Sequence, residues 1–185
     1  ALDGAIAANA ALGLMEPTGN GIGGDVFFII WDPKTQQLYG YNGSGRAPLE
    51  RSLIDLKSQI ASLRQSGAMP EDMLGIPQRG SLPVTVPGTV DGWFAAHARF
   101  GTLPMSDVLA PTIRYAREGF PITPVIAYYF ERNLNAFRDQ EALIEELDNA
   151  AALWFPKGRT PKAGEVFRNP DLANTLEILG NEGRA

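Results

Sequence analysis

The sequence contains no cysteine and only one histidine, His97. Disulfide bonds and thiol catalysis are therefore excluded for this chain, and a Cys/His zinc site cannot be assembled. We accordingly expect no metal and no cofactor. A Ser-His-Asp triad would have to use His97, which shares an apolar helical stripe with Trp93 and Phe94 and is predicted to be a packed residue. No Gly-x-Ser-x-Gly motif supports a triad.

Positive charge and long apolar runs are also scarce. The 16 Lys and Arg residues are outnumbered by 21 Asp and Glu residues, and no basic stripe with interleaved aromatic residues could follow a phosphate backbone. No apolar run approaches the roughly 18 residues of a membrane-spanning helix. We therefore expect neither nucleic acid nor a membrane as a partner. With 44% hydrophobic and 20% charged residues, we expect residues 1–185 to form a single globular domain, or one large piece of one.

Both ends of the chain resemble interrupted structure. The Ala-rich segment 1–14 has the composition of a buried helix but no Ser, Thr or Asp cap before it. The final apolar repeat, over residues 172–179, predicts a helix that stops near Gly183, two residues before the end. We expect further chain on both sides, so that these residues are a fragment of a larger protein.

The order of predicted elements places strands early and helices late. The run 25–32 is β-branched and aromatic throughout, which predicts a strand covered on both faces. Residues 37–42 are predicted to return as the second strand of a hairpin. Helices are predicted over 52–65, 88–100, 108–116, 121–152 with interruptions, and from Asn169 onward, and Ser52 with Asp55 resembles a capping box. This order predicts an α+β fold.

Two other patterns have plain structural interpretations. The glycine-rich segment 19–24 could cradle a phosphate through backbone amides. However, a nucleotide loop follows a strand and opens a helix, whereas this one follows a helix and opens a strand, so we predict a structural turn. The paired carboxylates Glu145 and Glu146 are adjacent on a predicted helix and do not face each other, so we interpret them as surface charge.

The segment 42–48, Asn-Gly-Ser-Gly-Arg-Ala-Pro, is the better candidate site. It is a polar loop at the end of a strand, where functional residues are common. The guanidinium of Arg46 could hold a substrate carboxylate through two hydrogen bonds, with the Ser44 hydroxyl or a backbone amide completing the pocket. The alternative is that Arg46 pairs with Glu50 or a helix end.

Short motifs occur in a specific order along nearly the whole chain. They are Leu2-Asp-Gly-Ala-Ile-Ala-Ala8, Glu16-Pro17, Gly21-Ile-Gly-Gly24, Val86-Pro-Gly-Thr-Val-Asp-Gly-Trp93, Phe100-Gly-Thr-Leu-Pro104, Leu109-Ala-Pro-Thr-Ile113, Glu118-Gly-Phe-Pro-Ile122 and Asn169-Pro-Asp-Leu172. Together they resemble the large subunits of γ-glutamyltransferases, also called γ-glutamyltranspeptidases.

The resemblance implies part of a four-layer αββα sandwich, the N-terminal-nucleophile hydrolase fold, within a precursor that cleaves itself into large and small subunits. In that family the new N-terminal Thr of the small subunit attacks a γ-glutamyl amide, as in glutathione. The Thr-Thr-His-type start of the small subunit is absent here. The resemblance therefore implies that this chain has no catalytic residue and needs the small subunit as a partner in a heterodimer.

One departure concerns the substrate. In γ-glutamyl enzymes the hairpin exit carries an Arg in a pattern like Arg-Glu-Thr-Ala-Pro, which clamps the α-carboxylate. Alignment on Ala47-Pro48 puts Ser44 at that place, and Arg46 lies two residues later. A shift of two keeps the same face on a strand, although no such rule holds in a loop. The Gly-Ser-Gly-Arg-Ala-Pro form, with Gly-Gly-Asp25, is closer to the γ-glutamyltransferase-like and cephalosporin-acylase-like branch.

Our main hypothesis is therefore an amide hydrolase or acyltransferase acting on a small carboxylate-bearing amide, with Arg46 and Ser44 in the acyl pocket. A second hypothesis is a non-catalytic small-molecule binding protein that kept the scaffold. A third, a helical interaction domain, predicts no concave polar site around residues 42–48.

Overall fold

The computed structural model describes residues 1–70, 72–145 and 147–184. The helices are α1 (Leu2–Met15), α2 (Leu53–Gln65), α3 (Thr89–Phe100), α4 (Met105–Glu118), α5 (Pro124–Arg138), α6 (Leu147–Trp154) and α7 (Pro170–Glu182), with short 3-10 turns η1 (Glu141–Leu143) and η2 (Pro156–Gly158). The strands are β1 (Val26–Asp32), β2 (Gln37–Gly43), β3 (Phe120–Pro121) and β4 (Val166–Phe167). The mixture agrees with the predicted α+β class.

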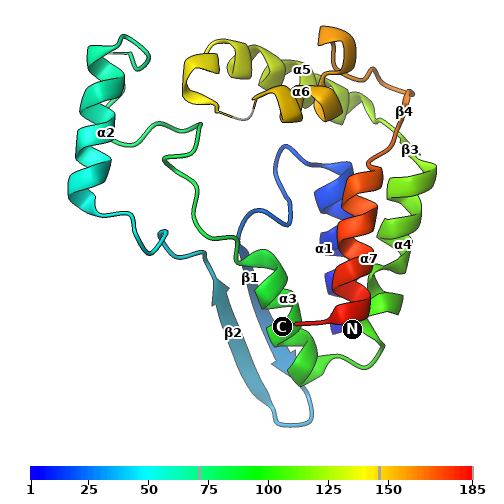
Figure 1. Cartoon of the computed structure of the whole chain (residues 1–185). Coiled ribbons are helices and arrows are strands. Elements are labelled where there is room, and N and C mark those ends of the chain that lie inside the picture. The colour runs from blue at the N-terminus through cyan, green and yellow to red at the C-terminus, as the bar shows by residue number, and fades with distance from the viewer. Residues whose placement is uncertain (71, 146, 185) are drawn as a thin grey trace.

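Helices α1, α4 and α7 pack side by side and form the main body (Figure 1). The Ala-rich sequence of α1 buries Ile6, Ala10 and Leu14 against these neighbours, because small side chains allow helices to approach closely. Leu109 of α4 and Leu176 of α7 lie in the same core, each at most 1% exposed. The helix predicted from residues 1–14 is confirmed, but it is buried on one face only, and Leu12 is 47% exposed.

A second core, rich in aromatic rings, joins α5 to the short β3–β4 pair. The rings of Phe120 and Phe167 meet edge to face, and Trp154 stacks on Phe167 with 5.2 Å between centroids. Asn169 caps α7 by accepting a hydrogen bond from the Leu172 amide at 3.0 Å. The predicted cap at Asn169 and the interrupted helix over 121–152 are both confirmed, except at position 146, which lies outside the described residues.

Strands β1 and β2 form an antiparallel hairpin whose register pairs Phe28 with Tyr41. One face of the hairpin packs on α3, where Tyr39 meets Phe100 and the rings of Phe28 and Tyr41 stack at 4.8 Å. The other face is open. Its exposed side chains, called here the open sheet face, are Phe27 (63% exposed), Ile29 (77%), Trp31 (58%) and Leu38 (65%).

The prediction that the 25–32 strand is covered on both faces is therefore wrong for this chain. The strand forms where expected, but exposure alternates along it, because α3 covers one side and the described residues place nothing over Phe27, Ile29 and Trp31. An uninterrupted apolar strand still indicates a sheet suited to cover on both sides.

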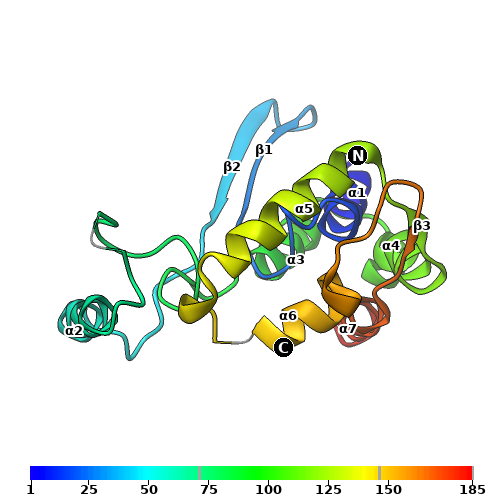
Figure 2. The ribbon, with the colours of Figure 1, turned by 90° about the horizontal axis from the view of Figure 1, so that it is seen from above.

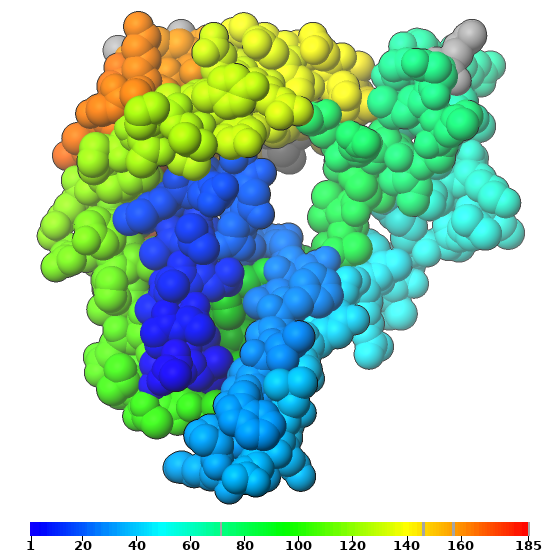
Figure 3. Space-filling model, turned by 180° about the vertical axis from the view of Figure 1, so that it is seen from behind, coloured from blue at the N-terminus to red at the C-terminus, as the bar shows by residue number. Residues whose placement is uncertain are grey.

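Helix α2 lies apart from the main body and is connected to it by two chain segments, around residues 46–51 and 81–86 (Figures 1 and 2). These two segments are called here the legs of the stalk, and the stalk together with α2 is called the arm. The Val86 amide donates to the Arg46 carbonyl at 2.9 Å, joining the legs. The predicted capping box is present, since Ser52 and Asp55 bond each other's backbone amides. No residue of α2 is buried. The space-filling view shows a hollow between this arm and the N-terminal segment (Figure 3).

Candidate functional site

Three loops meet at the end of the hairpin where β1 begins and β2 ends. They are residues 21–25, 43–46 and 85–89. The Gly24 carbonyl accepts the amides of Gly88 and Thr89, both at 3.0 Å, where α3 begins. The Thr89 hydroxyl donates to the Gly21 carbonyl at 3.3 Å. These contacts fix the glycine-rich turn against the first turn of α3.

The loops approach so closely that backbone packs on backbone. A Cβ atom added to Gly45 would overlap the Val86 carbonyl oxygen, and one added to Gly88 would overlap the Gly43 carbonyl oxygen. Only glycine fits where main chains come this near. The Gly-Ser-Gly motif at residues 43–45 and the Pro-Gly-Thr motif at residues 87–89 therefore belong to loops whose backbones pack against each other.

Asp25 ties the candidate loop to the start of β1. Its carboxylate accepts the Gly45 amide at 2.7 Å and the Ser44 hydroxyl at 3.3 Å. The Ser44 amide in turn donates to the Asn42 side-chain oxygen at 2.9 Å. With its proton directed at Asp25, the Ser44 hydroxyl oxygen is left as an acceptor, which suits a substrate N–H more than a substrate carboxylate.

The side chain of Arg46 is exposed. Within the described residues its guanidinium makes no hydrogen bond or ion pair, and the alternative pairing with Glu50 is not formed. Asn42, two residues before Ser44, lies opposite Phe27, whose side chain is on the open sheet face. Ser44, which is bonded to Asp25, therefore follows the end of β2 near the margin of that face, and Arg46 comes two residues later in the same loop, with no partner for its charge among the described residues.

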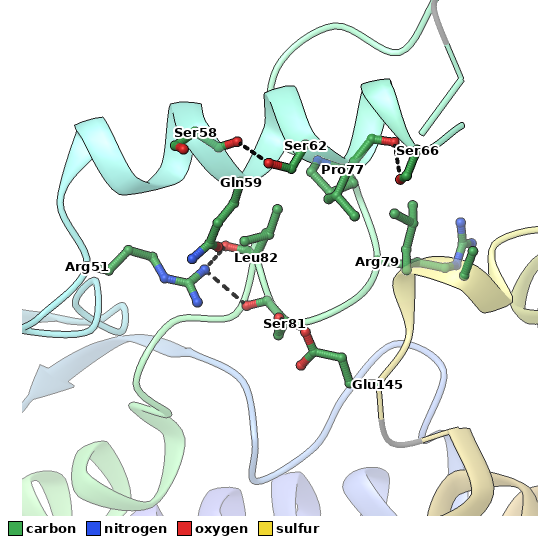
Figure 4. Close-up of a pocket in the computed structure, with 13 residues that line it drawn as sticks. Arg51, Ser58, Gln59, Ser62, Ser66, Pro77, Arg79, Ser81, Leu82 and Glu145 are labelled. Atoms are coloured by element: carbon green, nitrogen blue, oxygen red, sulfur yellow. Dashed lines mark hydrogen bonds between the residues drawn. The ribbon is translucent and has the colours of Figure 1, made fainter. Parts of the chain in front are cut away.

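The stalk and arm also border a cleft that sequence analysis missed (Figure 4). It has a volume of about 670 Å³ and lies between α2, the segment 77–82 and η1. Arg51 donates to the carbonyls of Ser81 and Leu82, and Glu145 accepts the Ser81 hydroxyl at 3.0 Å. The Arg51 bonds therefore join the two legs of the stalk, and the Glu145 bond links the stalk to the body. Helical periodicity could not have revealed a cleft formed by segments so distant in sequence.

The remaining candidate residues are structural. Amides of the glycine-rich turn donate to the Glu16 carbonyl at 3.2 Å, as expected for a turn. Of the predicted acidic pair, Glu145 bonds Ser81 and Glu146 lies outside the described residues. No helix in the described part of the chain is long and apolar enough to cross a bilayer. Over the same residues, no cluster of three or more His, Asp or Glu side chains could hold a metal ion.

His97 is packed, as predicted, and lies near an acid that the sequence did not single out. Its Nε2 atom is 2.7 Å from the Leu103 carbonyl oxygen and 3.9 Å from the Asp3 carboxylate. Asp3, 7% exposed, accepts the hydroxyl and amide of Thr102 and the Leu103 amide. The Thr102 hydroxyl is the main reason that the pKa of Asp3 lies below its usual value. This cluster joins the start of α1 to the α3–α4 turn.

Comparison with known proteins places the chain in one family along its whole length. The family model described as gamma-glutamyltranspeptidase matches residues 1–185. The chain is 31% identical over 186 residues to the glutathione hydrolase-like YwrD proenzyme of Bacillus subtilis, covering 100% of this chain and 31% of that protein. It is 32% identical over 189 residues to the oxamate amidohydrolase proenzyme of Klebsiella pneumoniae, covering 99% and 32%.

Comparison with solved structures points to the same family. Cephalosporin acylase from Bacillus halodurans matches with a TM-score of 0.85 and 36% identity, over 98% of this chain and 31% of that one. Helicobacter pylori gamma-glutamyltranspeptidase, at 22% identity, shares the fold with a TM-score of 0.79, over 99% of this chain and 48% of that one. The expected fold, part of the four-layer αββα sandwich of N-terminal-nucleophile hydrolases, is confirmed.

The chain spans about a third or less of the curated relatives that it matches. Several of those relatives are named as proenzymes or glutathione hydrolases, and the structural match includes an acylase. The matched range, residues 1–185, contains every motif block quoted from the sequence. This chain therefore belongs to the gamma-glutamyltranspeptidase family, in its glutathione hydrolase-like and cephalosporin-acylase-like branch.

Proposed function

We propose that this chain is the large-subunit part of an enzyme that hydrolyses or transfers a γ-glutamyl or related carboxy-acyl group from a small amide. The observation that carries the proposal is the gamma-glutamyltranspeptidase match over residues 1–185. The relatives are named as glutathione hydrolases, an oxamate amidohydrolase and a cephalosporin acylase, and glutathione, oxamate and cephalosporins are all small molecules that contain an amide and a carboxylate.

The nucleophile in this proposal is the N-terminal Thr of a separate small subunit. Its hydroxyl oxygen attacks the amide carbonyl carbon while its α-amine accepts the hydroxyl proton. The same proton then passes to the leaving amine as the C–N bond breaks. Water or an acceptor amine attacks the resulting ester, which releases the acyl group and restores the Thr hydroxyl. The chain described here contributes no catalytic residue and is inactive alone.

The chain's own contribution is to bind the substrate. Arg46, whose guanidinium has no partner among the described residues, binds the free carboxylate of the acyl group through two hydrogen bonds. Ser44 accepts a hydrogen bond from a substrate N–H, since its own proton is donated to Asp25. In this proposal the small subunit approaches the end of the hairpin, next to the loop that carries both residues.

The test uses the full-length protein, produced with the small subunit, and assays cleavage of a γ-glutamyl anilide and a glutaryl amide. Arg46→Ala is expected to raise KM for these substrates about 10- to 100-fold, the value of a charge-assisted hydrogen bond of about 1.5–3 kcal/mol. Arg114→Ala, at an exposed Arg of α4, is the matched control and should leave KM unchanged. If Arg46→Ala leaves both substrates unaffected, the proposed carboxylate clamp is wrong.

Intact-mass measurement tests the self-processing step. Two fragments with a Thr, Ser or Cys at the new N-terminus are expected from the full-length product. A single unprocessed mass, together with tight binding of glutarate and no turnover, would instead favour the non-catalytic binding protein.

A further inference from the structure

Hydrogen bonds fix the backbone on both the N-terminal and the C-terminal side of Arg46. On the N-terminal side, the Gly45 amide donates to Asp25 at 2.7 Å. On the C-terminal side, the Arg46 carbonyl accepts the Val86 amide at 2.9 Å. The guanidinium beyond this fixed backbone makes no bond within the described residues. A free charged side chain on a fixed main chain is how preorganised binding sites are built.

We propose that Asp25 is a positioning residue for substrate specificity, which acts by holding the loop that carries Arg46. The proposal rests on the proposed role of Arg46 and deepens it. Asp25 itself touches no substrate in this account. Its two carboxylate oxygens accept the Gly45 amide and the Ser44 hydroxyl, so both are bonded to the loop that carries Arg46.

The need for such a residue follows from the glycines beside it. Gly43 and Gly45 must be glycine, because Cβ atoms there would overlap Val26 and Val86 respectively. Glycine also gives the backbone its greatest freedom, so a loop with two of them loses more entropy when it orders than other loops do. Side-chain bonds from outside the loop must therefore supply the order, and Asp25 supplies two of them.

The far end of the same strand offers an internal control. Asp32 accepts the Lys34 amide and the Thr35 hydroxyl, both at 2.9 Å, and thereby organises the hairpin turn. Asp25, which is exposed, precedes β1, and Asp32, which is half-buried, is its last residue; each carboxylate accepts one backbone amide and one hydroxyl. They differ in that only the Asp25 loop carries Arg46.

The experiment compares Asp25→Ala, Asp25→Asn, Asp25→Glu and Asp32→Ala in the full-length processed enzyme. Asp25→Ala and Asp25→Glu are expected to raise KM for glutaryl amide about tenfold, with kcat changed less than about twofold, since ground-state binding is lost. Asp25→Asn should stay near wild type, because its amide oxygen can accept the Gly45 amide and its NH₂ can donate to the Ser44 oxygen. Asp32→Ala should lower the melting temperature without changing KM.

A double mutant separates positioning from independent binding. If Asp25 acts through Arg46, adding Asp25→Ala to Arg46→Ala should raise KM no further. Hydrogen exchange of the segment 43–47 gives a readout without turnover. It should speed up in Asp25→Ala and stay slow in Asp25→Asn and Asp32→Ala. Asp25→Glu, which keeps the charge and moves the carboxylate by one methylene, serves the same purpose if Asp25→Ala does not fold.

Three results would overturn the inference. A normal KM in both Asp25→Ala and Asp25→Glu, with Arg46→Ala impaired, would mean that the loop needs no help from Asp25. Equal losses in Asp25→Asn and Asp25→Ala would mean that the negative charge itself contacts substrate. Additive losses in the double mutant would exclude action through Arg46. An unimpaired Arg46→Ala would instead refute the proposed substrate-binding role of Arg46, so the two failures are distinguishable.

Discussion

At the scale of single residues, two buried threonines differ in one hydrogen bond. Thr112 of α4 is completely buried, and within the described residues its hydroxyl has no partner. Thr89 is 1% exposed, and its hydroxyl donates to the Gly21 carbonyl. An unpaired buried hydroxyl reduces stability, whereas a paired one contributes to it.

We therefore expect Thr112→Val to leave the free energy of unfolding unchanged or raise it by about 1 kcal/mol, and Thr89→Val to lower it by about 1–2 kcal/mol. Urea denaturation of both variants measures the difference. A clear loss of stability in Thr112→Val would show that its hydroxyl has a partner that matters.

The Asp3 cluster predicts a pH effect. The pKa of Asp3 is lowered in the folded state, first by the Thr102 hydroxyl, from an ordinary value of 3.8. Folding then favours the ionised form, so the contribution of Asp3 is complete above the unfolded-state pKa and is lost as pH falls through the folded-state pKa.

The Asp3→Asn variant isolates this contribution from those of Asp32, Glu165 and Glu177, whose pKa values are also lowered. The stability difference between wild type and Asp3→Asn should be largest near pH 6 and shrink as pH falls below about 4. Thermal melts between pH 7 and pH 3 measure it, and a difference that is constant with pH would contradict the assignment.

Residue-level predictions from sequence succeeded where the interaction is local. The Ser52 capping box and the Asn169 cap depend on residues three positions away, and the structure has both. Whether Arg46 binds substrate stays a prediction. The bond from Asp25 to Gly45 joins residues 20 apart through a loop, and no periodicity encodes it. It could not be predicted without the fold.

At the scale of elements, α3 packs on the hairpin through Gly92. A Cβ atom at Gly92 would overlap the Val26 side chain and lie 3.1 Å from the Tyr41 ring, whereas a Cβ atom at Gly4 of α1 would meet nothing within 4 Å. Alanine is favoured over glycine inside a helix by about 1 kcal/mol when nothing opposes it.

Gly4→Ala is therefore expected to raise the free energy of unfolding by up to about 1 kcal/mol, and Gly92→Ala to lower it by about 1–3 kcal/mol through overpacking. Melting temperatures of the two variants test this pair. Equal stabilisation in both would show that α3 can move away from the hairpin freely.

The positions of the helices and strands along the chain were largely predictable from the sequence, but which of their faces are buried was not. Apolar spacing predicted α2, α3 and α4 to within a few residues, because helical periodicity is local. The apolar run of β1 predicted cover on both faces, yet Ile29 is 77% exposed. Composition reflects the surroundings of a strand in the complete sandwich, of which this chain is one part.

At the scale of the whole molecule, the open sheet face dominates the behaviour of the isolated chain. In a sandwich, helices cover one side of each sheet and a second sheet covers the other. Helix α3 supplies the first cover here, and Phe27, Ile29 and Trp31 occupy the side on which a second sheet packs.

The isolated chain should therefore bind a hydrophobic dye such as ANS, and Ile29→Lys should reduce dye binding with little change in melting temperature. Ile30→Lys, on the α3 side of the same strand, should instead destabilise the chain, because it places a charge in a packed interface. Dye fluorescence and thermal melts on both variants separate the two faces. Equal dye binding by wild type and Ile29→Lys would mean that this face is not the exposed apolar surface.

The arm that carries α2 is a suitable place to insert additional residues. Its two legs are joined at the base by the Val86 amide and the Arg46 carbonyl, and α2 buries no residue. Open space surrounds Gly67, just beyond the helix, although its φ of 75° favours keeping this glycine itself. Lengthening a flexible loop costs only about 0.6 kcal/mol per doubling. A peptide tag or fluorescent label inserted after Gly67 is therefore expected to report on the protein while leaving the proposed carboxylate-binding loop undisturbed.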